Sequence, residues 1–117
     1  MVELRSVEQA GHLIAESSKR PVLLLKHSTR CGISAYADGQ FRMFQEEHAD
    51  PPVTCARVLV VEERAVSMWL AERLGVPHAS PQIMLIAGGN VVWHASHYSV
   101  NEKNIEEAMN RTTGKEA

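Results

Sequence analysis

Residues 21–34, "PVLLLKHSTRCGIS", join a continuous apolar run to a cysteine and then to a segment with helical periodicity. A continuous apolar run of this length is typical of a strand that is covered on both faces of its sheet. We therefore predict a buried strand over residues 22–26 that ends a few residues before Cys31.

The residues after Cys31 predict one long helix. Between residues 32 and 48, a single helical stripe is formed by Ile33, Ala37, Phe41, Phe44 and His48. Gly39 lies in the middle of this segment and weakens a helix by about 1 kcal/mol relative to alanine. Cys31 is therefore expected at the junction between a buried strand and the first turn of a helix.

The segments around this junction predict two more helices and one more strand. Ser6 and Gln9 fit a capping box for a helix over about residues 7–17. Residues 53–61, "VTCARVLVV", form a second apolar run and predict a second buried strand. The next helix is expected to end at Gly75. Its apolar face consists of Val66, Trp69, Leu70 and Leu74.

The last part of the chain predicts a hairpin followed by a helix. Residues 82–87 and 91–96 are expected to be strands joined by a tight turn at "GGN". One face of the second strand should pack against a helix, and that face carries Val91, Trp93 and Ala95. Ser99 and Glu102 fit a capping box for the final helix.

The predicted order of elements is α-β-α-β-α-β-β-α. Because each helix has one apolar stripe to bury, we expect an α/β fold with αβα layers around a four-stranded mixed sheet. Long crossovers make the first two strands parallel, and the hairpin adds an antiparallel edge. Residues 1–117 are expected to form a single domain with a frayed tail from about residue 112.

Composition excludes several classes of protein. A formal net charge of -2 argues against nucleic acid or an anionic membrane as the main partner. No apolar run approaches the ~18 residues of a membrane span, and the N-terminus lacks a signal pattern, so we expect a cytoplasmic protein. The chain has 2 cysteines, Cys31 and Cys55, which should be free thiols in a reducing compartment.

Cys31 lies where a thiolate would be stabilised. The first-turn amides of a helix carry a partial positive charge, and only the thiolate of a cysteine attacks a disulfide. Lys26, His27 and Arg30 are expected to add positive potential, so the pKa of Cys31 should lie below that of an ordinary thiol. Hydroxyl groups for the sulfur are available from Ser28, Thr29 and Ser34. The competing interpretation is that a cysteine simply fits a tight turn.

Two other residues complete the analysis of the candidate site. Cys55 lies inside a strand covered on both faces and is expected to be a small buried hydrophobe. Pro81 stands directly before a strand, and the Ser80–Pro81 bond is a candidate for the rare cis isomer. A cis bond there would turn the backbone of Ser80 outward, toward an extended substrate; an ordinary trans proline at a strand start is the alternative.

The chain resembles the thioredoxin fold and, within it, the monothiol bacilliredoxin family. The resemblance covers residues 6–110 and rests on "KHSTRCGIS" and "HASPQIMLIAGGNVVWHASH". It implies that Cys31 is the nucleophile, that Ser34 occupies the position of a resolving cysteine, and that Ser80–Pro81 is the cis pair. The family's Trp-His-x-Ser-His pattern is matched by Trp93, His94, Ser96 and His97.

The sequence departs from the family at two positions beside the nucleophile. Gly32 stands where the family usually has proline, and Arg30 is inserted between Thr29 and Cys31. The resemblance implies a substrate-binding edge formed by Thr29, Arg30, Gly32, Ser34, Ser80 and Pro81.

The function implied by the resemblance is removal of bacillithiol from mixed disulfides on client proteins. Bacillithiol is then a co-substrate; no further cofactor and no metal are expected, and the protein should be a monomer or a weak dimer. His94 and His97 are expected at the surface or the edge of the site, because zinc sites need four ligands in recurrent spacings.

Two alternatives come from other classes of protein. "CGIS", residues 31–34, also resembles the Cys-Gly-Phe-Ser signature of monothiol glutaredoxins that bind an iron–sulfur cluster, although no Gly-Gly-x-Asp motif follows the hairpin. The second alternative is a redox-inactive adaptor with a thioredoxin fold.

Overall fold

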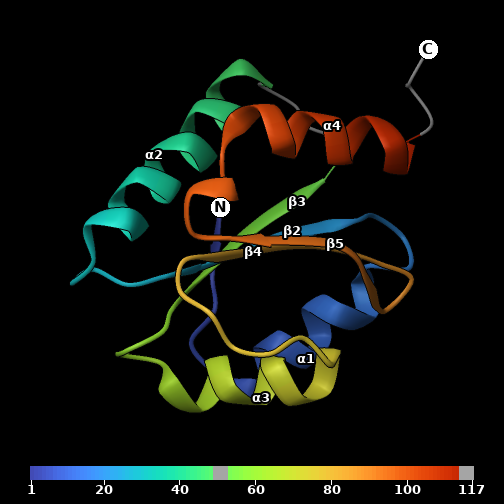
Figure 1. Ribbon diagram of the computed structural model, residues 1–117. Helices are drawn as coiled ribbons and strands as arrows, with labels where there is room; N and C mark the ends of the chain where they lie inside the picture. The colour runs from blue at the N-terminus through green and yellow to red at the C-terminus, as the bar shows by residue number, and fades with distance from the viewer. Residues whose placement is uncertain (49–52, 114–117) are drawn as a thin grey trace.

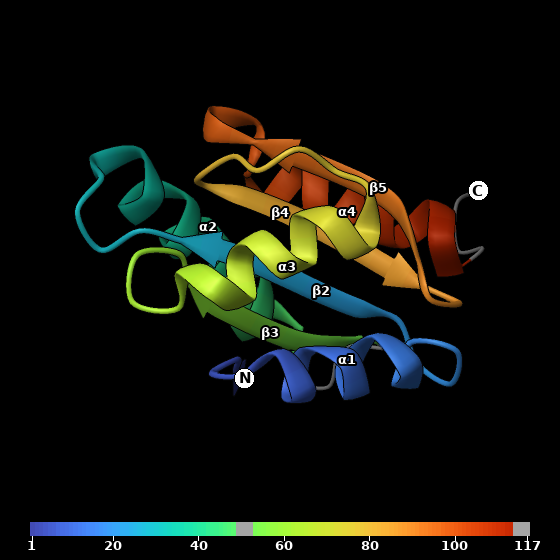
Figure 2. The same cartoon turned by 90° about the horizontal axis from the view of Figure 1, so that it is seen from below.

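The computed structural model describes residues 1–48 and 53–113. A mixed sheet of five strands has the order β1-β3-β2-β4-β5. The strands are β1 (Val2–Glu3), β2 (Val22–His27), β3 (Thr54–Leu59), β4 (Gln82–Ala87) and β5 (Asn90–Ser96). The helices are α1 (Val7–Glu16), α2 (Gly32–Glu47), α3 (Arg64–Leu74), the short 3-10 helix η1 (His97–Ser99) and α4 (Glu102–Thr113). Helices α1 and α3 cover one face of the sheet, and α2 and α4 cover the other (Figures 1 and 2).

Strand β2 lies in the middle of the sheet, as its continuous apolar run predicts. It pairs with β3 in parallel and with β4 in antiparallel orientation. Its side chains alternate between two cores, so Leu23 and Leu25 face α2 and α4 while Leu24 faces α1 and α3. The end of β2 and the beginning of β4 lie at the same end of the sheet, because Lys26 is paired with Gln82.

Strand β1 adds a fifth strand to the four that were predicted. It has only two residues, paired in parallel with Ala56 and Arg57 of β3, which is too short for any periodicity to show. Arg57 ties this edge to helix α2: its guanidinium lies 2.7 Å from a carboxylate oxygen of Glu3 and 3.0 Å from one of Asp38.

The predicted common face of Val91, Trp93 and Ala95 is wrong. The pairing of β4 with β5 shifts between Leu85 and Ile86, so that Leu85 pairs with Trp93 and Ile86 with Val91. This bulge leaves one extra residue in β5 and reverses the alternation of side chains. Trp93 and Ala95 pack toward α2 and α4, whereas Val91 packs into the core under α1 and α3.

Helix α4 begins differently from the predicted capping box of Ser99 and Glu102. The side chain of Asn101 caps it instead, with Oδ1 accepting a hydrogen bond of 2.9 Å from the amide of Asn104. The amide of Glu102 donates to Oε1 of Gln40 at 2.9 Å, which joins α4 to α2. Helix α4 continues to Thr113, so the tail expected from about residue 112 still begins as helix; residues 114–117 lie outside the described part.

No helix in residues 1–48 and 53–113 is long and apolar enough to cross a membrane.

One charged side chain of β2 is completely buried. Lys26 is 0% exposed, on the face that α3 covers. Its ammonium donates to the backbone oxygen of Ser67 at 3.0 Å and lies 3.3 Å from Nδ1 of His78. Burial lowers the pKa of Lys26 to about 8. The charge is therefore solvated by neutral protein groups in place of water.

Replacing this lysine by an apolar residue of similar length should stabilise the fold. A lysine whose pKa falls on folding destabilises the native state below its folded pKa, and the penalty decreases as the pH rises from about 8 toward 10.5. Lys26→Met should therefore raise the free energy of unfolding at pH 7 by roughly 1–2 kcal/mol, after the lost hydrogen bonds are discounted. Urea unfolding of wild type and Lys26→Met at pH 7 and pH 10 measures the difference in free energy of unfolding.

The control is Lys19→Met, because Lys19 is exposed. A Lys26→Met protein that is less stable than wild type at pH 7, or whose advantage does not decrease at pH 10, would contradict this interpretation of Lys26.

Candidate functional site

Cys31 lies at the junction that the sequence predicted, as the N-cap residue of α2. Its backbone is extended, with φ -126° and ψ 127°, and its carbonyl accepts the first helical hydrogen bond from Ala35 at 3.1 Å. The thiol is free and partly exposed. The sulfur therefore stands at the helix end where backbone amides have no partner within the helix.

The start of α2 makes this thiol more acidic than an ordinary cysteine. The pKa of Cys31 is lowered by the backbone N–H of Ser34, then by that of Ile33, and to a smaller extent by the Ser34 hydroxyl. Ser34 is fully buried beneath the cysteine, and among the described residues its Oγ has no other hydrogen-bond partner. The site thus holds donors in place for a thiolate.

The basic neighbours contribute less than the sequence suggested. Lys26 points to the opposite face of the sheet, toward α3, so its predicted role beside Cys31 is wrong. His27 faces α2, and burial lowers its pKa, so it is neutral near pH 7. Arg30 is exposed and is not among the groups that lower the pKa of Cys31. The backbone amides at the start of α2 are therefore the main cause of the lowered pKa of Cys31.

Three of the predicted substrate-binding residues surround Cys31 at the surface. Gly32 is the first residue of α2, and a Cβ there would meet no atom within 4 Å. Arg30 and Thr29 are exposed on the preceding turn, where the Thr29 hydroxyl donates to a carboxylate oxygen of Glu62 at 3.4 Å. Exposed residues therefore flank Cys31 on both sides along the chain.

The Ser80–Pro81 peptide bond is cis, as predicted. It lies at the same end of the sheet as Cys31, because Gln82 follows it and pairs with the end of β2. Among the described residues, the amide and carbonyl of Ser80 make no backbone hydrogen bond. Pro81 is buried, and its carbonyl accepts from the amide of His97 at 3.0 Å.

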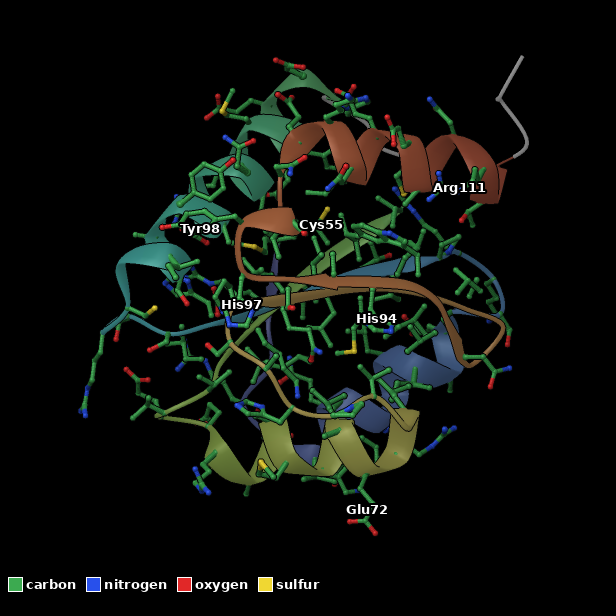
Figure 3. The ribbon with its side chains drawn as sticks, viewed as in Figure 1. Cys55, Glu72, His94, His97, Tyr98 and Arg111 are labelled. Atoms are coloured by element: carbon green, nitrogen blue, oxygen red, sulfur yellow. The ribbon has the colours of Figure 1, made fainter. Side chains whose placement is uncertain are left out.

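Residues after β5 form the rim of this end of the molecule (Figure 3). His97 has a positive φ of 55° and is exposed. Tyr98 packs edge-to-face on Tyr36 of α2, with ring centroids 5.5 Å apart. Neither tyrosine was singled out in the sequence, where isolated aromatic residues give no signal. His94 lies in mid-strand, paired with Met84.

Cys55 lies far from this site and is buried, as predicted. It is paired with Leu23 near the beginning of β2, whereas Cys31 follows the other end of that strand. The four steps from Leu23 to His27 alone span about 13 Å. Burial raises the pKa of Cys55, which has 8% of its surface exposed. Figure 3 shows it under α4, between the helix layer and the sheet.

A polar network that the sequence did not reveal lies behind Ser34. Asp38 is paired with Arg57 at 3.0 Å and with Arg42 at 2.8 Å, and these two pairs hold its pKa below the usual range although burial opposes them. His27 borders this network, and its Nδ1 is buried without a hydrogen-bond partner among the described residues. The network attaches the first half of α2 to the sheet.

Among the described residues, one group of carboxylates lies close enough together to consider as metal ligands. It consists of Glu47, Glu102 and Glu106. Glu47 is the last residue of α2, and the helix begins directly after Cys31. At 1.5 Å per residue, Glu47 therefore lies about 24 Å along the helix axis from Cys31. A side-chain hydrogen bond with Glu47 raises the pKa of Glu102, and desolvation and repulsion from Glu47 add to the effect. No histidine or cysteine belongs to this group.

Comparison with solved structures identifies the fold. A protein titled as a candidate oxidoreductase with a thioredoxin fold has a TM-score of 0.82 and 33% identity over 92% of this chain and 91% of its own. Thioredoxin of Fasciola hepatica has a TM-score of 0.76 and 21% identity over 95% of this chain and 98% of its own. Mitochondrial thioredoxin 3 of Saccharomyces cerevisiae, in its oxidised form, has a TM-score of 0.72 and 16% identity over 95% of this chain and 94% of its own. The fold is that of thioredoxin, with one more strand than predicted.

Comparison with protein families assigns the chain to one family. The profile described as "Monothiol bacilliredoxin BrxC" matches residues 2–105, nearly the whole chain. With its single thiol at the start of α2, the chain belongs to the monothiol bacilliredoxin family, a family of thiol oxidoreductases.

Proposed function

We propose that this protein removes bacillithiol from mixed disulfides on client proteins in the cytoplasm, with Cys31 as its nucleophile. The observation that supports this most strongly is the position of the Cys31 sulfur against the amides of Ser34 and Ile33, which lower its pKa. A lowered pKa increases the fraction of Cys31 that is present as the thiolate, which is the form that attacks a disulfide. Membership of the bacilliredoxin family supports bacillithiol as the thiol.

The first step is a thiol–disulfide exchange. The Cys31 thiolate attacks the bacillithiol sulfur of the mixed disulfide. A Cys31–bacillithiol disulfide forms, the original S–S bond breaks, and the client leaves as a thiolate that takes a proton from water. Thr29, Arg30 and Gly32 are exposed and would flank the substrate. The backbone of Ser80, which makes no backbone hydrogen bond within the described part of the chain, would pair with it.

The second step needs a thiol from outside the protein. Ser34 holds no sulfur, and Cys55 is separated from Cys31 by the length of β2. Free bacillithiol would attack the bacillithiol sulfur of the adduct, form bacillithiol disulfide and restore the Cys31 thiolate. In the sum of both steps the client is reduced, and two bacillithiol molecules are joined by an S–S bond.

The two cysteines should differ strongly in reactivity. Brief iodoacetamide treatment of the folded protein at neutral pH, followed by peptide mapping, should label Cys31 much faster than Cys55, because the pKa of Cys31 is lowered and that of Cys55 is raised. The alkylation rate of Cys31 should also rise with pH, and the midpoint of this rise should lie at lower pH in the folded protein than in the unfolded chain. Ser34→Ala should move that midpoint upward while leaving it below the unfolded value, since the two amides remain.

Ser18→Ala, at an exposed serine, is the control for Ser34→Ala. Equal labelling of both thiols, or a Cys31 midpoint equal to that of the unfolded chain, would contradict the role of the helix start.

Single substitutions should separate the two thiols in the exchange itself. With a client that carries a bacillithiol mixed disulfide, Cys31→Ser should abolish client release, whereas Cys55→Ser should leave the first exchange largely unchanged. Ser34→Cys should release bacillithiol from the adduct without added thiol, because a cysteine there lies next to Cys31. Mass spectrometry after one turnover follows each species.

If Cys55→Ser abolishes client release as fully as Cys31→Ser, the two thiols act as a pair and the single-thiol mechanism is wrong. Colour in the purified protein would favour the iron–sulfur alternative.

A further inference from the structure

Lys26 and His78 form a buried contact that the exchange chemistry leaves unexplained. Lys26 is 0% exposed, and its ammonium contacts the carbonyl of Ser67 and Nδ1 of His78, both uncharged. The ion pairs of the described residues join Arg42 and Arg57 to acidic side chains, and none includes Lys26. A buried charge of this kind costs folding stability.

The contact fixes the proton on the His78 ring. An ammonium group has no acceptor, so Nδ1 of His78 must accept the hydrogen bond from Lys26. The hydroxyl of Ser67 also lies 3.3 Å from this nitrogen. Burial and the charges of Lys26 and Arg64 lower the pKa of His78, so the ring stays neutral near pH 7. The single proton of the neutral ring is then on Nε2, which becomes a fixed donor.

This donor lies in the loop that leads to the cis proline. His78 is an exposed residue, so the part of the ring remote from the buried Nδ1 contact is accessible from solvent. The loop is held on the sheet by Lys26 and also by Gln82, whose Nε2 donates to the carbonyl of Pro77 at 3.0 Å. Lys26 and Gln82 are paired at the end of the sheet from which the Cys31 turn departs.

The local charge favours an anion. Lys26 lies behind the ring and Arg64 begins α3 close by, and both are positive groups that act on His78. The carboxylate of Glu62, which lies between β3 and α3, accepts a hydrogen bond from the hydroxyl of Thr29. A carboxylate at Nε2 would accept a hydrogen bond and lie in the field of a poorly screened positive charge.

We propose that Nε2–H of His78 binds a carboxylate of the low-molecular-weight thiol while Cys31 attacks the sulfur of that thiol. Lys26 is the positioning residue, which orients the His78 ring and supplies the positive charge of this subsite. The inference rests on the proposed function and extends it to substrate recognition. Bacillithiol carries carboxylates on its malate group. A carboxylate held near the cis-proline loop would direct the bacillithiol sulfur, rather than the client sulfur, toward Cys31.

Exchange kinetics with paired substrates test this subsite. One peptide with a single cysteine is prepared as a mixed disulfide with bacillithiol and, separately, with uncharged 2-mercaptoethanol, so that any acidic group of the peptide is common to both. His78→Leu and Lys26→Met should each slow release from the bacillithiol form about tenfold, the factor expected for one lost charge-assisted hydrogen bond. Release from the mercaptoethanol form should not change.

The expected loss lies in KM, with kcat retained, because a remote carboxylate contact is equal in the ground and transition states. His78→Gln keeps an N–H near the place of Nε2 and should retain most of the preference, and His12→Leu, at an exposed histidine of α1, is the matched control. In Lys26→Met, the pH profile of Cys31 alkylation should stay as in wild type. Equal losses on both substrates would overturn the proposal, since they indicate a merely structural role.

A binding measurement separates this inference from the proposed function. S-methyl bacillithiol cannot exchange, and its binding should shift the ring signals of His78 in 1H–15N NMR spectra, which should also show the Nε2–H tautomer. If binding occurs in wild type and is lost in His78→Leu while no exchange is seen, the subsite stands and the de-bacillithiolation proposal fails. If exchange occurs and S-methyl bacillithiol leaves His78 unaffected, the subsite is wrong.

Discussion

The amides of Ser34 and Ile33, which face the sulfur of Cys31, are the interaction on which the chemistry of this protein depends. They are available only because the backbone turns from extended to helical at Cys31 itself. Two parts of the fold hold the backbone at Cys31 in this conformation. Strand β2 is paired on both sides at the centre of the sheet, and Arg57 attaches α2 to β3 and β1. The core thus holds a short piece of backbone in the geometry that a thiolate requires.

The same architecture supports the proposal that Cys31 reacts without Cys55. In a parallel pair such as β2 and β3, residues at opposite ends stay apart by the length of the strand, and Cys31 and Cys55 lie at opposite ends. Burial favours the neutral thiol at Cys55, and the helix start favours the thiolate at Cys31. In the proposed mechanism, serine at position 34 leaves the Cys31 adduct without a neighbouring thiol to resolve it, so a thiol from outside the chain, either free bacillithiol or another reductase, would have to do so.

Much of this could be predicted from the sequence, since the elements that position Cys31 are long and strongly patterned. The apolar run of β2, the helical stripe after it and the cis proline were predicted correctly. Strand β1 is too short to show a pattern, and the bulge in β5 depends on its partner strand. The error at Lys26 was avoidable: alternate residues of a strand face opposite sides, so closeness to Cys31 in sequence did not mean closeness in space. The contact with His78 depends on a loop far along the chain.

The most direct measurement of the single-thiol mechanism is the intact mass of the wild-type protein after incubation with oxidised bacillithiol and, separately, with oxidised glutathione. We expect one bacillithiol adduct per chain, located on Cys31 by peptide mapping, with Cys55 still reduced and a weaker reaction with glutathione. A protein that carries no adduct and instead has a disulfide between Cys31 and Cys55 would contradict this mechanism and require the fold to open. Preferential reaction with glutathione would contradict bacillithiol as the co-substrate.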